Sequence, residues 1–112
     1  MSITTPKQII PPHELTAGQV TEYTVTAGKT KIQRITFTNT DTVIRTVTVH
    51  YVLSAGTADD TNIVLNALAI GPKRSVAPPV LEGHVLELGG FISMAADVTS
   101  KITVVGTGLE IV

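Results

Sequence analysis

Residues 31–53 read KIQRITFTNTDTVIRTVTVHYVL, and this stretch decides the fold class. In its second half, large apolar side chains mostly alternate with small polar ones, which is the period of a strand with one face on a core. The first half alternates in the same way and places Ile35 and Phe37 on one face. Between the halves lies Asn39-Thr40-Asp41-Thr42, whose Asn and Asp side chains favour a tight turn. We therefore predict two strands joined as an antiparallel hairpin.

The composition supports the same fold class. The chain of 112 residues contains 18 threonines, 14 valines and 11 isoleucines, and all three residue types are branched at Cβ. Branching at Cβ restricts χ1 and disfavours helix, whereas it packs well on a pleated surface. Charged residues make up only 15%, against about 25% in an average soluble domain. We expect one all-β domain with a surface that is poor in charge.

Several weaker segments complete the set of predicted strands. The segment 62–70 also fits a short helix through Ile63, Ala67 and Ile70, but its length and the lack of a basic last turn favour a strand. Pro78-Pro79 should confine its segment to a sheet edge. About eight strands with turn signals every 8–12 residues indicate an antiparallel sandwich or barrel. The further predicted segments are 20–26, 62–70, 76–81, 84–88, 91–96 and 101–112.

The first 18 residues are predicted to form an extended N-terminal arm, followed by a single β-sandwich domain over residues 19–112. Pro6, Pro11 and Pro12 disfavour both helix and central strand pairing in this segment. An arm of this kind frays or lies against a neighbour. We expect apolar side chains of the arm to anchor it to a partner, and they are Ile9, Ile10 and Leu15.

The sequence offers no expected catalytic, metal or cofactor site. Cysteine is absent, and His13, His50 and His84 are isolated from one another in sequence. An enzyme would need His50 and His84 to meet a carboxylate in space. A net charge of −1 without a basic cluster argues against nucleic acid, and the lack of a long apolar run argues against a membrane span.

Two polar loops remain as candidate partner-binding tips. The loop at 54–62 carries Asp59, Asp60 and Asn62, which lack the ligand spacing of a calcium loop. The turn at 71–75 carries Lys73 and Arg74. Each also fits a solvated turn whose side chains cap the local backbone.

A carbohydrate site is the alternative class of binding site. Such sites use exposed aromatic rings, and this chain has only four rings and no tryptophan. Exposure of Tyr23 would favour this alternative, whereas Phe37 and Tyr51 fall on predicted core faces.

The order of these segments resembles small virion proteins of tailed bacteriophages. The resemblance rests on a strand that ends in Asn39-Thr40, a following Thr-Val-rich strand at 45–49, and the closing run 106–111. It also includes 54–57, 60–62 and 86–90, and it covers about residues 20–112. The chain departs from the pattern at Gly90, where those proteins usually carry an acidic residue.

The resemblance implies a jelly-roll-like sandwich in a phage particle, located in the virion and made in the host cytoplasm. It implies a decoration (cement) protein that binds the major capsid protein, or another virion protein, and stabilises the head. A homo-oligomer, with a trimer favoured, would suit that role. The alternative is an accessory protein of the tail or neck, or a receptor- or glycan-binding module.

Overall fold

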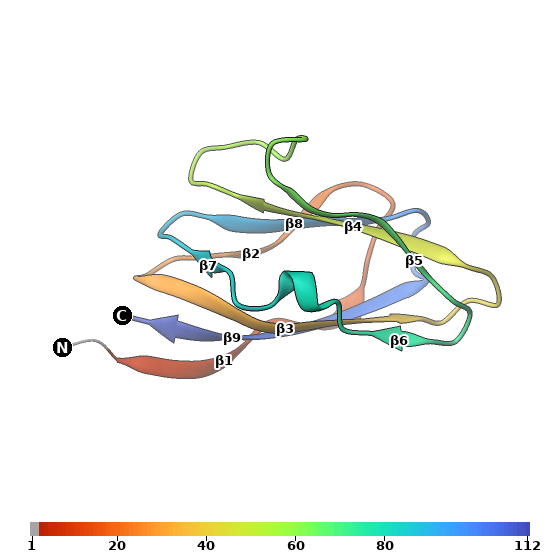
Figure 1. Ribbon diagram of the computed structural model, residues 1–112, viewed down its shortest axis with the longest axis horizontal. Coiled ribbons are helices and arrows are strands. Elements are labelled where there is room, and N and C mark those ends of the chain that lie inside the picture. The colour runs from red at the N-terminus through yellow and green to blue at the C-terminus, as the bar shows by residue number, and fades with distance from the viewer. Residues whose placement is uncertain (1–2) are drawn as a thin grey trace.

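A computed structural model describes residues 3–112 as two antiparallel sheets packed face to face, which confirms the predicted all-β sandwich (Figure 1). The first sheet has the order β1 (Thr4–Glu14), β9 (Ile102–Ile111), β3 (Lys29–Asn39) and β6 (Ser75–Val76), and β7 (Val85–Leu86) also pairs with β3. The second sheet has the order β2 (Val20–Thr24), β8 (Phe91–Ala96), β4 (Arg45–Val52) and β5 (Ile63–Ile70). A single 3₁₀ turn, η1 (Pro79–Leu81), lies between β6 and β7. Successive strands change sheet except at β4–β5 and β6–β7, where both strands belong to one sheet, and the two strand orders are those of a jelly roll.

The predicted hairpin between residues 31–38 and 43–53 is wrong, because β3 and β4 belong to different sheets. The turn between them crosses from one sheet to the other, and Asn39 is buried at the start of this crossing. Alternation predicted the buried faces correctly at Ile35, Phe37 and Val49, which are all fully buried, but it failed at the end of β4, where Val52 is buried and the following Leu53 is 75% exposed. These faces cover each other across the sandwich instead of lying side by side in one sheet. Side chains alternate with a period of two in either arrangement, so alternation alone cannot tell which strands pair.

The predicted N-terminal arm is also corrected within residues 3–18; residues 1 and 2 lie outside the described residues. Residues 4–14 form the edge strand β1, which pairs with β9 along its length. Ile9, Ile10 and Leu15 lie in the core of the chain itself and are at most 4% exposed, so they are not available to a partner in this fold. Proline is compatible with this position because an edge strand needs hydrogen-bond donors on one side only.

Two glycines of β9 allow β1 to pack closely against it. A Cβ atom at Gly106 would lie 3.2–3.3 Å from three side-chain atoms of Ile10, and one at Gly108 would lie 3.3 Å from Cδ1 of Ile9. The absence of a side chain on β9 therefore lets both isoleucines approach its backbone closely. Ile9 and Ile10 are both buried although they are consecutive, because the register shifts between Gln8 and Ile10.

The exposed sheet edges are poorly suited to the addition of another strand. Ile3 and Val112 exchange both backbone hydrogen bonds, so the alternation of the ladder turns Pro6 of β1 away from β9 and leaves no donor there. At the edge of the other sheet, β5 carries two register shifts, and its Ala67 has φ +49°. Strand β2 carries one register shift, and β6 and β7 are two residues long each. Within residues 3–112 no helix is long and apolar enough to cross a bilayer.

Candidate functional site

An open cleft of about 530 Å³ lies beneath the loop that joins β4 to β5. This loop stands away from the second sheet, and the segment from η1 to β7 bounds the cleft on the other side (Figure 1). The volume falls within the range of ligand-binding clefts. The lining residues are Tyr51, Val52, Leu53, Gly56, Thr57, Asp59, Thr61, Asn62, Ile63, Val64 and His84.

The rings of Tyr51 and His84 meet edge to face in this cleft, with centroids 5.2 Å apart and an interplanar angle of 72°. The Tyr51 hydroxyl donates to the Leu81 carbonyl at 2.7 Å, and burial raises the pKa of Tyr51 well above its usual range. The hydroxyl therefore stays a neutral donor, which fixes the ring. His84 Nε2 lies 2.9 Å from the Val80 carbonyl, which can only accept, so Nε2 carries the proton. In the neutral ring, Nδ1 of His84 is then left as an acceptor.

The β4–β5 loop is held by its own side chains. Asp59 Oδ1 accepts from the Thr61 backbone N–H at 2.9 Å and from the Thr61 hydroxyl at 2.5 Å. Asn62 Oδ1 accepts from the Asp59 N–H at 3.0 Å, and Asn62 Nδ2 donates to the Thr57 carbonyl at 2.8 Å. The contacts with Thr61 lower the pKa of Asp59, so the carboxylate is charged at neutral pH. Its Oδ2 atom has no hydrogen bond or ion pair to any residue between 3 and 112.

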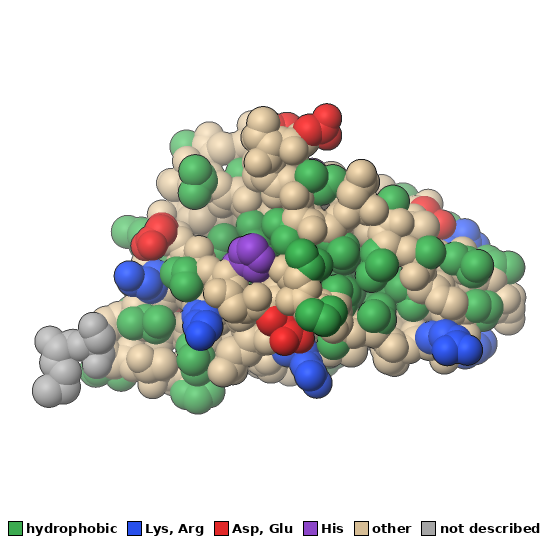
Figure 2. All heavy atoms as spheres, in the orientation of Figure 1, with side chains coloured by type: hydrophobic (Ala, Val, Ile, Leu, Met, Phe, Trp, Pro, Cys, Tyr) green, Lys and Arg blue, Asp and Glu red, His purple; other side chains and the backbone are tan. Residues whose placement is uncertain are grey.

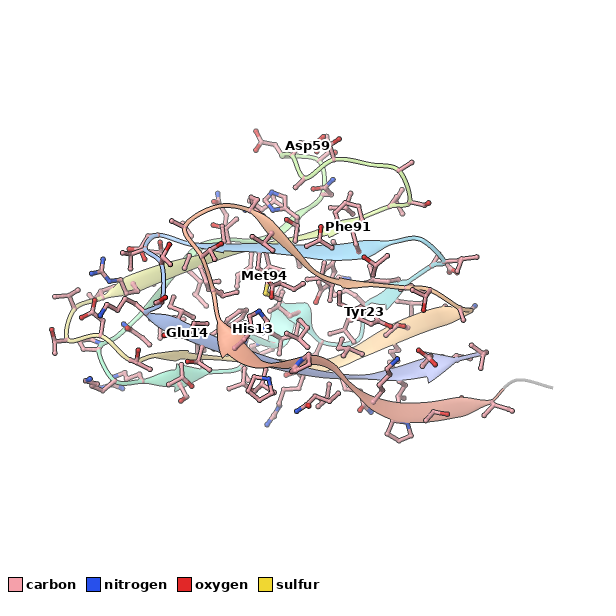
Figure 3. The ribbon with its side chains drawn as sticks, turned by 180° about the vertical axis from the view of Figure 1, so that it is seen from behind. His13, Glu14, Tyr23, Asp59, Phe91 and Met94 are labelled. Atoms are coloured by element: carbon pink, nitrogen blue, oxygen red, sulfur yellow. The ribbon has the colours of Figure 1, made fainter. Side chains whose placement is uncertain are left out.

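Of the loop residues proposed from sequence, the structure brings two into the cleft. Asp59 and Asn62 line it, whereas the neighbouring Asp60 is exposed and does not. Figure 3 shows Asp59 on the part of the loop that projects beyond the sheets. The cleft therefore combines a charged carboxylate with two rings and the exposed side chain of Leu53.

The other two proposed residues lie elsewhere, in the turn between β5 and β6. Lys73 has φ +57°, and its ammonium group donates to the Thr40 carbonyl at 2.6 Å. Arg74 is exposed, and its side chain forms no ion pair or hydrogen bond within the described part of the chain. Figure 2 shows basic side chains at this end of the molecule and acidic ones at the tip of the β4–β5 loop.

His50 lies on the face of β4 opposite Tyr51 and is 7% exposed. Its Nδ1 atom is buried and has no hydrogen-bond partner among the described residues. Residues 3–112 contain no group of three His, Asp or Glu side chains that could hold a metal ion. An enzyme would need His50, His84 and a carboxylate at one site. His84 and Asp59 both line the cleft, but His50 does not.

Sequence reasoning did not assign Tyr51 and His84 to a binding site. Strand alternation predicts Tyr51 on the core face, against which it is partly packed, and His84 is isolated from the other histidines in sequence. The contact between the two rings depends on the 3₁₀ turn that begins after Pro78. This turn places Leu81 in the core, where it is fully buried. The Pro78-Pro79 pair was the available signal, because proline favours the first turn of such an element.

Tyr23 does not provide the exposed ring that a carbohydrate site would use. It is half-buried, and its hydroxyl is 2.7 Å from the hydroxyl of Thr30, which is itself buried. The structure therefore gives this residue a packing role at the edge of the core.

No protein-family model matches this chain, and no curated protein matches it in sequence. Its fold is similar to that of a chain from Bacillus endospore appendages, which are disulfide-linked pili, with a TM-score of 0.54 and 9% identity. That match covers 97% of this chain and 88% of the other. A chain in the structure of infectious bursal disease virus, Gx strain, is also similar, with a TM-score of 0.50 and 11% identity. This match covers 99% of the present chain, which spans 33% of the viral one. At these identities the similarity concerns the fold alone, a β-sandwich that also occurs in a pilus and in a virus particle.

Proposed function

We propose that this chain is a structural subunit of a bacteriophage virion, and that it binds the assembled capsid and stabilises it as a decoration protein. The observation that carries the proposal is the exposure of large apolar side chains in turns and loops of an otherwise well-packed sandwich. Ile44 is 60% exposed in the β3–β4 turn, and Leu53 is 75% exposed in the β4–β5 loop. Val43, next to Ile44, is 48% exposed as well, and adjacent exposed apolar side chains of this kind suit contacts with other proteins.

The protected sheet edges support contacts through loops. Because Pro6 and the register shifts of β5 oppose strand addition, the subunit can lie beside other β-rich proteins without open-ended sheet extension. A decoration protein needs this property, since it is present at high local concentration on a shell.

Stabilisation of the capsid would follow from linkage. A protein that binds the assembled shell but not the free capsid subunits shifts the equilibrium toward the shell by RT ln(1 + [L]/Kd) for each site. At a concentration of 100 times Kd this amounts to about 2.7 kcal/mol per site. Copies joined in a closed ring, with a trimer favoured, would bind several capsid subunits together and add avidity.

The test is co-sedimentation of the purified chain with capsids of the encoding phage from which bound accessory proteins have been stripped. We expect saturable binding to expanded capsids and a higher temperature of capsid rupture. A double variant with Ile44→Ser and Leu53→Ser should bind at least about tenfold more weakly, because each change removes apolar area from the contact. Val112→Ser, at a side chain that is 48% exposed near the chain end, is the matched control.

Binding to stripped tails with no binding to capsids would overturn the head assignment and support the tail or neck alternative. Absence of binding to any virion part, with folded protein confirmed by circular dichroism, would overturn the structural proposal as a whole.

A further inference from the structure

The acidic cleft and the basic turn are separated by the length of one strand. Ile63, at the start of β5, lines the cleft, and Ile70, at its end, precedes the turn that carries Arg74. Seven steps of about 3.3 Å place the two sites roughly 23 Å apart. This distance is too long for Arg74 to reach the cleft of its own chain.

The β5–β6 turn presents an exposed basic side chain on a held backbone. Lys73 is held in a left-handed conformation, and its Nζ is tied to the β3–β4 turn through Thr40, so the backbone of the turn is fixed. Arg74 follows it with a guanidinium group that has no partner in the described chain. Ile44, from the adjacent β3–β4 turn, adds an exposed apolar side chain at this end.

The cleft has the complementary features. Asp59 Oδ2 is unpaired among the described residues, and the rings of Tyr51 and His84 line the same cleft. A guanidinium group fits such a site better than an ammonium group, because it binds a carboxylate through a planar fork and stacks on rings. Leu53 on the rim is 75% exposed and offers apolar surface to an incoming turn.

We propose that copies of this chain associate head to tail, with Arg74 of one copy bound in the Asp59 cleft of the next. The contact joins two different surfaces, so it generates a closed ring if the rotation between copies closes, and a filament if it does not. This inference deepens the proposed function, since it names the contact through which subunits on a shell would be joined.

Two variants disable opposite sides of the contact without disturbing the fold. Asp59→Asn keeps the oxygen that accepts from Thr61 but removes the charge, and Arg74→Gln changes a side chain that has no polar partner in the described chain. Asp60→Asn and Lys29→Gln are the matched controls, since both residues are exposed and neither lines the cleft. Sedimentation velocity and equilibrium runs on the full chain up to about 0.5 mM measure the association.

We expect concentration-dependent association of the wild type and of both controls, and at least about tenfold weaker association of each cleft or turn variant. The decisive sample is an equimolar mixture of Asp59→Asn and Arg74→Gln. The first retains a working turn and the second a working cleft, so the mixture should form a dimer that cannot grow further. A symmetric contact between identical surfaces would not give this result.

The head-to-tail contact is overturned if the wild type stays monomeric, if both variants associate as the controls do, or if the mixture contains only monomers. Co-sedimentation with capsids separates this failure from failure of the proposed function. Capsid binding by a monomeric wild type leaves the decoration role standing, whereas self-association without binding to any virion part overturns that role alone.

Discussion

Asn39 is the residue that holds the crossing from the first sheet to the second. It is fully buried, and its Nδ2 atom lies 2.8 Å from the Val43 carbonyl, 2.9 Å from that of Ile70 and 3.2 Å from that of Gly71. Its Oδ1 atom accepts from the Asp41 N–H at 2.9 Å. One side chain thus satisfies backbone groups from β5 and from the turn, at a place where no ladder can do so.

The variant Asn39→Ala should lower the free energy of unfolding by about 2–3 kcal/mol, because it leaves buried carbonyl groups without donors. Urea denaturation followed by circular dichroism measures the change. Asn66→Ala, at an exposed position of β5, is the control and should change it by no more than about 0.5 kcal/mol. Equal midpoints for the two variants would contradict the role of Asn39.

His13 ties the edge strands of the two sheets together. Its Nδ1 lies 2.8 Å from the Pro11 carbonyl, and its Nε2 forms an ion pair with Glu22 of β2. Both nitrogens face acceptors, so the ring is best satisfied when doubly protonated. The pKa of His13 is raised, first by the Pro11 carbonyl and further by Glu22, while burial opposes the shift.

A raised histidine pKa stabilises the fold fully below the unfolded value of about 6.5, and this contribution is lost as pH rises through the folded value. We expect the wild type to exceed His13→Gln in unfolding free energy by more at pH 5.5 than at pH 8.5. Exposure of the side chain limits the difference to under about 1 kcal/mol. A proton NMR titration of the His13 ring checks the direction, and a value below 6.5 would contradict it.

At the scale of elements, β1 is an integral strand of the sandwich. It contacts β9 almost exclusively. The ion pair of His13 with Glu22 and the buried Leu15, just after the strand, link it to the rest of the fold. Ile10 has no exposed surface and packs over Gly106, where the backbone of β9 is bare.

The variant Ile10→Ala should therefore cost about 2–5 kcal/mol of stability, since it opens a cavity between β1 and β9. Ile3→Ala, at a side chain that is 60% exposed, is the control and should be nearly neutral. Denaturant midpoints give the comparison. A small effect of Ile10→Ala would indicate that β1 is a detachable arm and contributes little to the core.

Deletion of residues 1–18 tests the same point more severely. The deletion removes three buried side chains and uncovers the edge of β9, so we expect an unfolded or aggregated product. A shortened chain with dispersed amide resonances would show that β1 is dispensable.

At the scale of the whole molecule, the sandwich is elongated, with extents of 49, 26 and 20 Å. The β4–β5 loop and the β5–β6 turn lie in different parts of its long dimension and differ in the sign of their exposed charge (Figures 1 and 2). Copies that join through these sites would therefore line up along the molecule instead of stacking on their faces.

Self-association through opposite charges should weaken as salt is added. Because the Debye length falls from about 10 Å at 0.1 M to about 3 Å at 1 M, we expect a several-fold loss of affinity over that range. Sedimentation equilibrium at both concentrations measures it. Association that is insensitive to salt would assign the contact to the apolar side chains of Ile44 and Leu53 instead of to Arg74 and Asp59.

The sequence by itself determined most of the strands between residues 20 and 111, and the buried faces of β3 and of β4 as far as Val49, because strand alternation is local and is written into neighbouring residues. The faces of β3 and β4 and the strand at 63–70 are examples. Asp59 and Asn62 could be proposed as loop-tip residues for a related reason, since short polar side chains in turns are a local signal.

Only the tertiary structure decided which strands pair, where β1 belongs and what meets in the cleft. The hairpin between β3 and β4 was wrong because pairing depends on the packing of distant segments, which leaves the alternation of each strand unchanged. The prolines of β1 allow an edge strand as well as an arm, and the choice depends on the bare backbone of Gly106 and Gly108. Tyr51, Asp59 and His84 meet only because the 3₁₀ turn and the crossing between sheets bring separate segments together.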